Sequence, residues 1–211
     1  MKYYLRLFLH LLLAIGFSSA TAGAYEDYFR AVSADDARTV SGLLERGFDP
    51  NSPDERGQVG LYLALRDGSL KVAATLLAHP ALKVDAANAA DETPLMMAAL
   101  RGNLEWTQRL IDRGAKVSRS GWTPLHYAAS GPEPKLLTLL LDRGAPIEAP
   151  SPNGTTPLML AAQYGSPDAA EVLLARGADP KARNALGLTA ADFARQGGRD
   201  TLAARLEAAT K

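Results

Sequence analysis

One phrase occurs four times along this chain at intervals of about 33 residues, and this periodicity constrains the fold more than any other feature. The copies begin with "DETPLMMAAL" at residue 91, "GWTPLHYAAS" at 121, "GTTPLMLAAQ" at 154 and "GLTAADFARQ" at 187. Two divergent copies precede them, near residues 57 and 24. A period of this length indicates a stack of similar units, each burying its apolar face against the next, rather than one domain with a single core.

Each copy is typical of a pair of short helices. In the copy at 121, Thr123 is placed as a helix N-cap, and Pro124 stands at the first helical position, where its missing N–H costs nothing. The small side chains of Ala128 and Ala129 let helices of adjacent copies approach closely. A second phrase, "LLLDRGA" at 139, predicts a second helix that ends at Gly144 in a left-handed conformation.

The phrase "TPLHYAA" followed by "LLLDRGA", with a period of 33, resembles the ankyrin repeat. The resemblance implies an all-α repeat solenoid in which each repeat is a helix–turn–helix followed by a short β-hairpin finger. It covers residues 25–211 as about six repeats, the first and last being atypical caps. The repeats are expected near 25–56, 57–90, 91–120, 121–153, 154–186 and 187–211.

The first 24 residues have the order of a secretory signal peptide. Lys2 and Arg6 are followed by the apolar run "LFLHLLLAIGF" and then by the small residues of "SSATAGA". The run is 11 residues long, whereas a membrane-spanning helix needs about 20. We expect cleavage after Ala24 and a periplasmic or secreted mature chain; an uncleaved membrane anchor is the alternative.

Composition narrows the function classes. The chain has no cysteine, which excludes disulfides, thiolate catalysis and cysteine-based metal centres. It has 23 basic and 23 acidic residues, so no cationic field favours nucleic acid or an anionic membrane surface. We expect no cofactor, no metal, no nucleic acid and no membrane insertion after cleavage, and a chain that is a monomer.

His126 is the one residue of the repeated phrase that suggests chemistry. A histidine can act as a general base or as a metal ligand. Outside the leader, however, the chain has only His79 besides it, and it carries none of the common hydrolase, phosphate-loop or dinucleotide motifs. In the family that the phrase resembles, this histidine usually forms hydrogen bonds between repeats. A structural role is therefore favoured, and the chain is predicted not to be an enzyme.

Trp122 is the candidate for recognition. It occupies the variable place between Gly121 and Thr123, at the base of a finger that faces the concave side expected of such a stack. The copy before it is three residues short, so the finger at Ser118–Ser120 should be clipped beside the indole. An exposed aromatic residue there is typical of a binding hot spot. Packing of the indole on a neighbouring finger is the alternative.

Variable positions at the ends of the first helices extend this surface. Leu100, Trp122 and Tyr164 are predicted to form an apolar and aromatic strip, rimmed by polar residues. An aromatic centre with arginine at its edge suits a protein interface; a scatter of unrelated surface residues is the alternative. The complete predicted partner-binding set is Arg66, Leu100, Arg101, Trp122, Gln163 and Tyr164.

A column of arginines recurs just before the glycine that ends each second helix, at Arg46, Arg113, Arg143 and Arg176. It could form an anion-binding ladder. The alternative is that each cation stabilises the negative C-terminal end of its own helix.

Two functions from different classes follow from these patterns. The first is an exported, non-enzymatic protein that binds a partner protein through its concave face, as a scaffold, anchor or protector. The second is an immunity or inhibitor protein that blocks a periplasmic toxin or hydrolase through the same face. Without its leader the chain has only two more acidic than basic residues, which gives the inhibitor reading little support.

Overall fold

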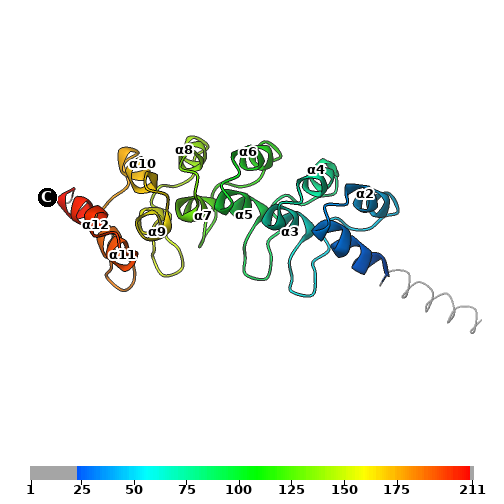
Figure 1. Cartoon of the computed structure of the whole chain (residues 1–211), viewed down its shortest axis with the longest axis horizontal. Coiled ribbons are helices and arrows are strands. Elements are labelled where there is room, and N and C mark those ends of the chain that lie inside the picture. Colours follow the sequence, from blue (N-terminus) through cyan, green and yellow to red (C-terminus); the bar gives the residue numbers. More distant parts are fainter. Residues whose placement is uncertain (1–22, 210–211) are drawn as a thin grey trace, which may run out of the picture. The chain divides into compact units, whose positions relative to one another are not determined.

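The computed structural model describes residues 23–209, which form short α-helices joined by turns (Figure 1). Within this range the single β pairing is an isolated bridge between Pro53 and Val59. The expected all-α repeat fold is therefore confirmed. The predicted leader lies outside the described residues, apart from Gly23 and Ala24, which are helical.

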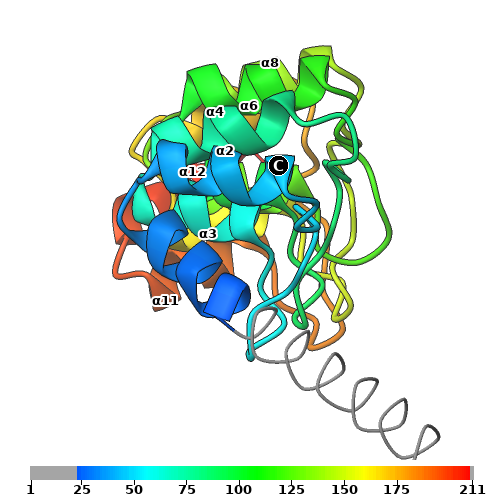
Figure 2. The ribbon, with the colours of Figure 1, turned by 90° about the vertical axis from the view of Figure 1, so that its right-hand side faces the viewer.

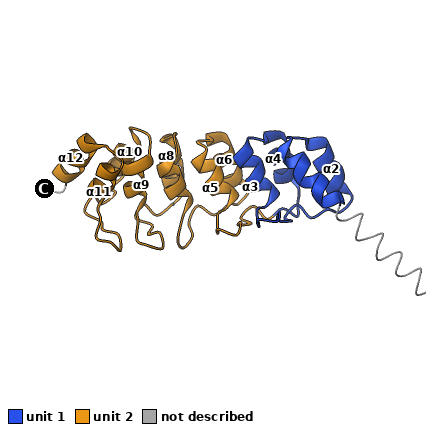
Figure 3. Ribbon diagram, turned by 60° about the horizontal axis from the view of Figure 1, so that its bottom comes forward, with its two compact units in different colours: residues 1–82 blue, residues 83–211 orange. Residues whose placement is uncertain are grey.

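The chain falls into two compact units, Met1–Leu82 and Lys83–Lys211 (Figure 3). In unit 1, the described residues 23–33 are helical and are followed by α2 (Ala37–Glu45), α3 (Gly60–Asp67) and α4 (Leu70–Ala78). Unit 2 consists of four helix pairs: α5 (Pro94–Leu100) with α6 (Leu104–Asp112), α7 (Pro124–Ser130) with α8 (Lys135–Asp142), α9 (Pro157–Tyr164) with α10 (Ala169–Ala175), and α11 (Ala190–Gln196) with α12 (Asp200–Ala208).

The helix pairs of unit 2 form two layers. In the inner layer α5 packs against α7, α7 against α9 and α9 against α11; in the outer layer α8 contacts α6 and α10. Figure 2 shows α6 and α8 on the same side of the inner layer. The core between the layers is built from buried leucines and alanines of both, so each pair depends on its neighbours for burial.

The predicted helix starts and stops are confirmed. Thr123 is the N-cap of α7 and Pro124 its first residue, and in the next copy the Thr156 hydroxyl accepts a hydrogen bond from the Met159 amide. Gly144 follows the C-cap of α8 with φ of 86°, the left-handed conformation that glycine adopts without strain.

The fingers are hydrogen-bonded turns rather than paired strands. In the last finger the Asn184 amide donates to the Leu188 carbonyl, the Gly187 amide donates back to Asn184, and the Asn184 side-chain oxygen accepts from two further amides. The fingers around Asp54, Asn88 and Ser151 repeat this backbone pairing. The expected β-hairpin is thus reduced to its turn.

The finger before α7 differs, as its shorter sequence predicts. The structure describes all of residues 116–123, and the backbone pairing shared by the other fingers is not formed there. In Figure 1 the loop before α7 reaches less far from the helices than the loop before α9. Arg119 instead forms an ion pair with Asp91 of the preceding finger.

Unit 1 replaces the usual proline of the inner helix with Gly60, and the packing shows why. The Tyr28 ring is fully buried, stacks on Phe48 with centroids 4.5 Å apart, and lies over the start of α3. A methyl group on Gly60 would lie 2.1 Å from the Tyr28 hydroxyl oxygen and 2.9 Å from the ring carbon that bears it. Only a residue without a side chain fits beneath this ring.

Gly60→Ala should therefore lower the free energy of unfolding by about 1–3 kcal/mol, because the added methyl overpacks a filled site. Gly42→Ala in α2 is the matched control: its methyl would lie 3.5 Å from the nearest atom, on the flexible Arg46 side chain, so we expect a gain of about 0.5–1 kcal/mol from helix propensity. Urea unfolding followed by circular dichroism measures both. Equal stability of Gly60→Ala and the wild type would contradict this account of the packing.

Candidate functional site

Three of the residues predicted to bind a partner are brought together in unit 2. Leu100, Trp122 and Tyr164 line one groove of about 220 Å³. We call it the Trp122 groove and define it by its seven lining residues: Leu100, Trp122, His126, Tyr127, Ser130, Leu160 and Tyr164. Its walls thus come from the inner helices α5, α7 and α9 and from the finger base before α7.

The groove exists because α7 ends in small residues. Leu100 ends α5, whereas the corresponding place in α7 is Ser130, followed by Gly131. A methyl group on Gly131 would lie 3.0 Å from the Ala99 carbonyl oxygen, and one on Gly165, after α9, would lie 2.5 Å from that of Ala129. These glycines allow the inner helices to approach closely, while Ser130 leaves the space above them open.

Trp122 forms one wall of the groove and is half exposed, with 37% of its surface accessible. Its ring meets the His126 ring edge-on, with centroids 5.2 Å apart and an interplanar angle of 78°. Tyr164, which lines the same groove, is 61% exposed. Two large aromatic side chains thus stand at the mouth of one groove, which is unusual for residues with no contact to make.

His126 forms part of the framework of the groove. It is fully buried, and its Nε2 lies 3.0 Å from the Thr155 carbonyl oxygen of the next repeat. Its Nδ1 accepts the Thr123 N–H at 3.2 Å, so in the neutral ring Nε2 carries the proton and donates to Thr155. Burial lowers the pKa of His126 below its ordinary value, which keeps the ring neutral. The expected hydrogen bond between repeats is confirmed.

Tyr127 is held against the groove by a carboxylate. Its hydroxyl donates to Glu92 Oε1 at 2.7 Å, and the Asn88 side-chain amide donates to Glu92 Oε2 at 2.8 Å. Glu92 belongs to the preceding repeat, at the finger-base position that Trp122 occupies in its own. These hydrogen bonds restrict the Tyr127 ring, and they engage its hydroxyl with Glu92.

The other three predicted residues do not line the groove. Arg101 is exposed at the C-cap of α5, and Gln163 is half-buried on α9. Arg66 belongs to unit 1, where its guanidinium pairs with Asp67 at 2.7 Å and donates to Gln58. Sequence reasoning missed Tyr127 and Leu160 as lining residues. Their signal was their shared place in the repeat, four residues after Thr123 and Thr156.

The arginine column links consecutive repeats. Arg143 pairs with Asp112 at 3.5 Å and Arg176 with Asp142 at 2.6 Å, each reaching the preceding repeat. Both arginines are C-caps of their helices, as the helix-end reading predicts. Exposed pairs of this kind contribute at most about 1 kcal/mol each. Because the guanidinium groups of Arg143 and Arg176 are already paired with carboxylates, these two members of the column are poorly suited to bind anions.

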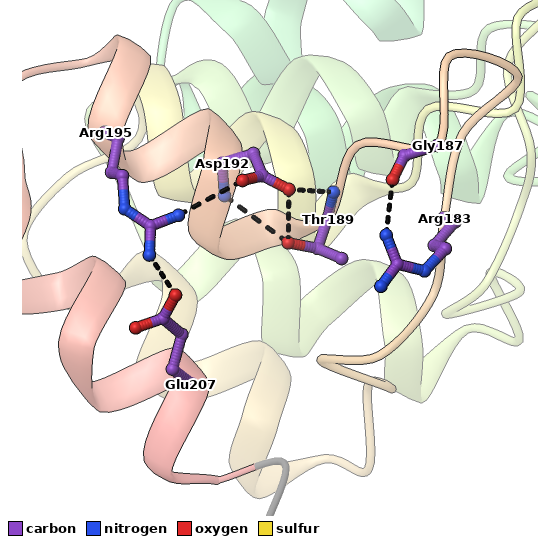
Figure 4. A network of polar contacts seen from close by, with 6 residues as sticks. All are labelled: Arg183, Gly187, Thr189, Asp192, Arg195 and Glu207. Carbon is purple, nitrogen blue, oxygen red and sulfur yellow. Dashed lines mark hydrogen bonds and ion pairs between the residues drawn. The ribbon is translucent and has the colours of Figure 1, made fainter.

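A second cavity, of about 570 Å³, lies in the last repeat between the finger and α11 and α12. Figure 4 shows a polar network beside it, in which Arg195 lies between Asp192 and Glu207, while Arg183 donates to the Gly187 carbonyl. Asp192 accepts from the Thr189 amide and hydroxyl, both at 2.8 Å, and pairs with Arg195, which also pairs with Glu207. These bonds lower the pKa of Asp192 below its ordinary range. These bonds link the start of α11 to α12 in the last helix pair of unit 2.

The described residues provide no group of three or more His, Cys, Asp or Glu side chains that could hold a metal ion. Within the same part of the chain, no helix has the length and apolarity needed to cross a membrane.

Comparison with known proteins agrees with this architecture. A family model described as "Ankyrin repeats (3 copies)" matches residues 28–120 and 108–184. Relatives include the probable E3 ubiquitin-protein ligase XBOS31 of Oryza sativa subsp. japonica, 35% identical over 133 residues, which are 59% of this chain and 29% of that protein. The ankyrin repeat and SAM domain-containing protein 6 of Danio rerio is 36% identical over 70 residues, 33% of this chain and 10% of that protein.

A third relative is the transient receptor potential cation channel subfamily A member 1 of Homo sapiens, 28% identical over 117 residues, 54% of this chain and 10% of that protein. The chain therefore spans less than a third of the length of any of these relatives.

The burial of a neutral His126 predicts a pH dependence of stability. Because the folded pKa lies below the ordinary 6.5, the unfolded chain takes up the proton first as the pH falls. The contribution of the buried, neutral His126 to the free energy of unfolding is fully present above pH 6.5 and is lost as the pH falls toward the folded pKa. His126→Met, which places there the residue of Met96 and Met159, should lose less free energy of unfolding between pH 7.5 and 5.5 than the wild type. Urea unfolding at both pH values measures it, and equal losses would contradict the assignment.

Proposed function

Because the chain belongs to the ankyrin-repeat family, whose repeats bind other proteins, we propose that it is a non-enzymatic binding protein that holds its partner in the Trp122 groove. The observation that carries the proposal is the meeting of Trp122 and Tyr164 at the mouth of one apolar groove. Both are exposed although large and aromatic, and residues of this kind supply most of the binding energy at protein interfaces.

The rigidity of the groove supports the same function. Trp122 rests on His126, His126 is bonded to Thr123 and Thr155, and Tyr127 is bonded to Glu92. Side chains fixed before binding lose little conformational entropy when the partner arrives. The proposal assigns no chemistry to His126, because both of its ring nitrogens are already hydrogen-bonded, Nδ1 to Thr123 in its own repeat and Nε2 to Thr155 in the next.

For the cellular role, we propose export to the periplasm or beyond, followed by action as a scaffold, anchor or protector of a partner protein. The support is the order of basic, apolar and small residues in 1–24. An immunity or inhibitor protein would use the same groove. The relatives carry their repeats within much longer proteins of different names, so binding is the property that the shared part suggests for this chain.

Trp122→Ala should weaken capture of the partner at least about 10-fold, which corresponds to about 1.4 kcal/mol, because it removes the central aromatic wall. Capture is measured by affinity purification of the tagged protein from the extract of its own compartment. The captured protein is identified by mass spectrometry, and its affinity for the wild type and the variant is then compared by titration.

Leu104→Ala is the matched control. Leu104 is 39% exposed, close to the 37% of Trp122, but it opens α6 in the outer layer. It should leave affinity unchanged. Unchanged affinity in a folded Trp122→Ala variant, or an equal loss in Leu104→Ala, would rule out the groove as the binding site.

Export can be tested on the same preparations. If residues 1–24 are a cleaved leader, the protein recovered from cells expressing the full sequence should begin at Tyr25, and intact mass measurement would show this directly. Recovery of the uncut chain from the membrane fraction would favour the anchor instead.

A further inference from the structure

We propose that the Trp122 groove receives a single uncharged apolar side chain, aromatic or branched aliphatic, carried on an exposed segment of the partner. This assignment rests on the proposed function and adds the chemistry of what is bound. It follows from the volume of the groove, from the hydrogen bonds that its polar atoms already form, and from the small size of Ser130 in its lining.

The size limits the occupant. The volume of about 220 Å³ is below the roughly 300–1,000 Å³ of clefts that enclose small-molecule ligands. A helix, about 10 Å or more across with its side chains, cannot enter such a space. A single large side chain can, in the manner of an anchor residue that fills a pocket at the centre of an interface.

The polar atoms limit its chemistry. The Tyr127 hydroxyl is bonded to Glu92, both His126 nitrogens are bonded to backbone groups, and the Ser130 hydroxyl donates to the His126 carbonyl at 3.2 Å. None of the seven lining residues is Asp, Glu, Lys or Arg. A charged occupant would give up part of its hydration and would meet no side chain of opposite charge among the lining residues. An apolar side chain would meet mainly rings and aliphatic groups, since the Trp122 indole N–H and the Tyr164 hydroxyl are the other polar groups of the lining residues.

Ser130 determines whether the space is open. Seven residues after the capping threonine, the neighbouring repeats carry Leu100 and Gln163, whereas α7 carries serine. Ser130→Leu therefore gives α7 the residue that α5 already has at this place, and the fold should tolerate it. The added isobutyl group would occupy the groove without altering Trp122 or Tyr164.

The experiment uses the protein expressed from its full coding sequence, labelled with ¹⁵N, and four probes. N-acetyl-L-phenylalanine amide and N-acetyl-L-leucine amide are the apolar probes; N-acetyl-L-lysine amide and N-acetyl-L-glutamate amide are the charged ones. The readout is the indole N–H resonance of Trp122. Trp106, with 2% of its surface accessible and Arg109 stacked 4.1 Å from its ring, is the internal reference.

We expect the apolar probes to shift the Trp122 resonance saturably, with Kd values on the order of millimolar. The charged probes should bind at least about 10-fold more weakly, Trp106 should not move, and Ser130→Leu should abolish the response. Equal shifts from charged and apolar probes, no shift up to the solubility limit, or an unchanged response in Ser130→Leu would each overturn the proposal.

A second copy of the chain is the competing occupant. Sedimentation equilibrium of the same samples should show a monomer, and a dimer that Ser130→Leu abolishes would overturn the proposal. The proposed function is judged separately by capture with Trp122→Ala. If the probes fail but that variant still loses its partner, the chemistry assigned to the groove is wrong and the proposed function stands.

Discussion

The close approach of consecutive inner helices is the constraint on which the rest of unit 2 depends. Gly131, Gly165 and Gly197 each follow an inner helix, and a methyl group on any of them would lie 2.5–3.0 Å from a carbonyl oxygen of the preceding repeat. At this separation the buried alanines of α5, α7, α9 and α11 come into contact, and the outer helices can cover the leucines between the layers. A wider spacing would leave voids that these small residues cannot fill.

The same constraint explains why the groove lies on α7. A glycine follows α7, α9 and α11, whereas Arg101 follows α5, and the position seven residues after the capping threonine is free to vary. In α5 and α9 it carries Leu100 and Gln163, whereas α7 carries Ser130. The small side chain of Ser130 and the finger shortened by three residues both lie in the repeat region where Trp122 is exposed. The candidate site therefore results from a small residue at Ser130 and a shortened finger in an otherwise regular repeat, rather than from an added element.

The parts of this structure that could be predicted from the sequence are those dictated by short-range geometry. The capping role of Thr123, the left-handed Gly144 and the clipped finger each follow from local bonding rules, which hold wherever the chain places them. The meeting of Leu100, Trp122 and Tyr164 followed from the repeat register. Tyr127 and Leu160 could not be assigned in this way, because their place on the inner helix holds a buried residue in some repeats and a half-exposed one in others.

The side-chain pairs between repeats also could not be predicted from the sequence. The bond from Tyr127 to Glu92 joins residues 35 apart, and that from Arg176 to Asp142 residues 34 apart. The repeat period does not show whether a polar side chain bonds to a neighbouring repeat or to water. The pairing of the predicted rim residue Arg66 was likewise not anticipated: it belongs to unit 1, where its guanidinium pairs with the carboxylate of the adjacent Asp67.

A stack of repeats is open-ended by construction, because whatever packs on one repeat could pack on the next, and an unblocked end invites growth into a filament. His126 donates an N–H forward to the following repeat, but in the last repeat the same place holds Asp192, whose carboxylate turns back to Thr189 and Arg195. The forward donor is thereby replaced by an acceptor that is already occupied. The same place in the repeat thus holds a buried ring that bonds forward to Thr155 in one copy, and in another a carboxylate that bonds back to the start of its own helix.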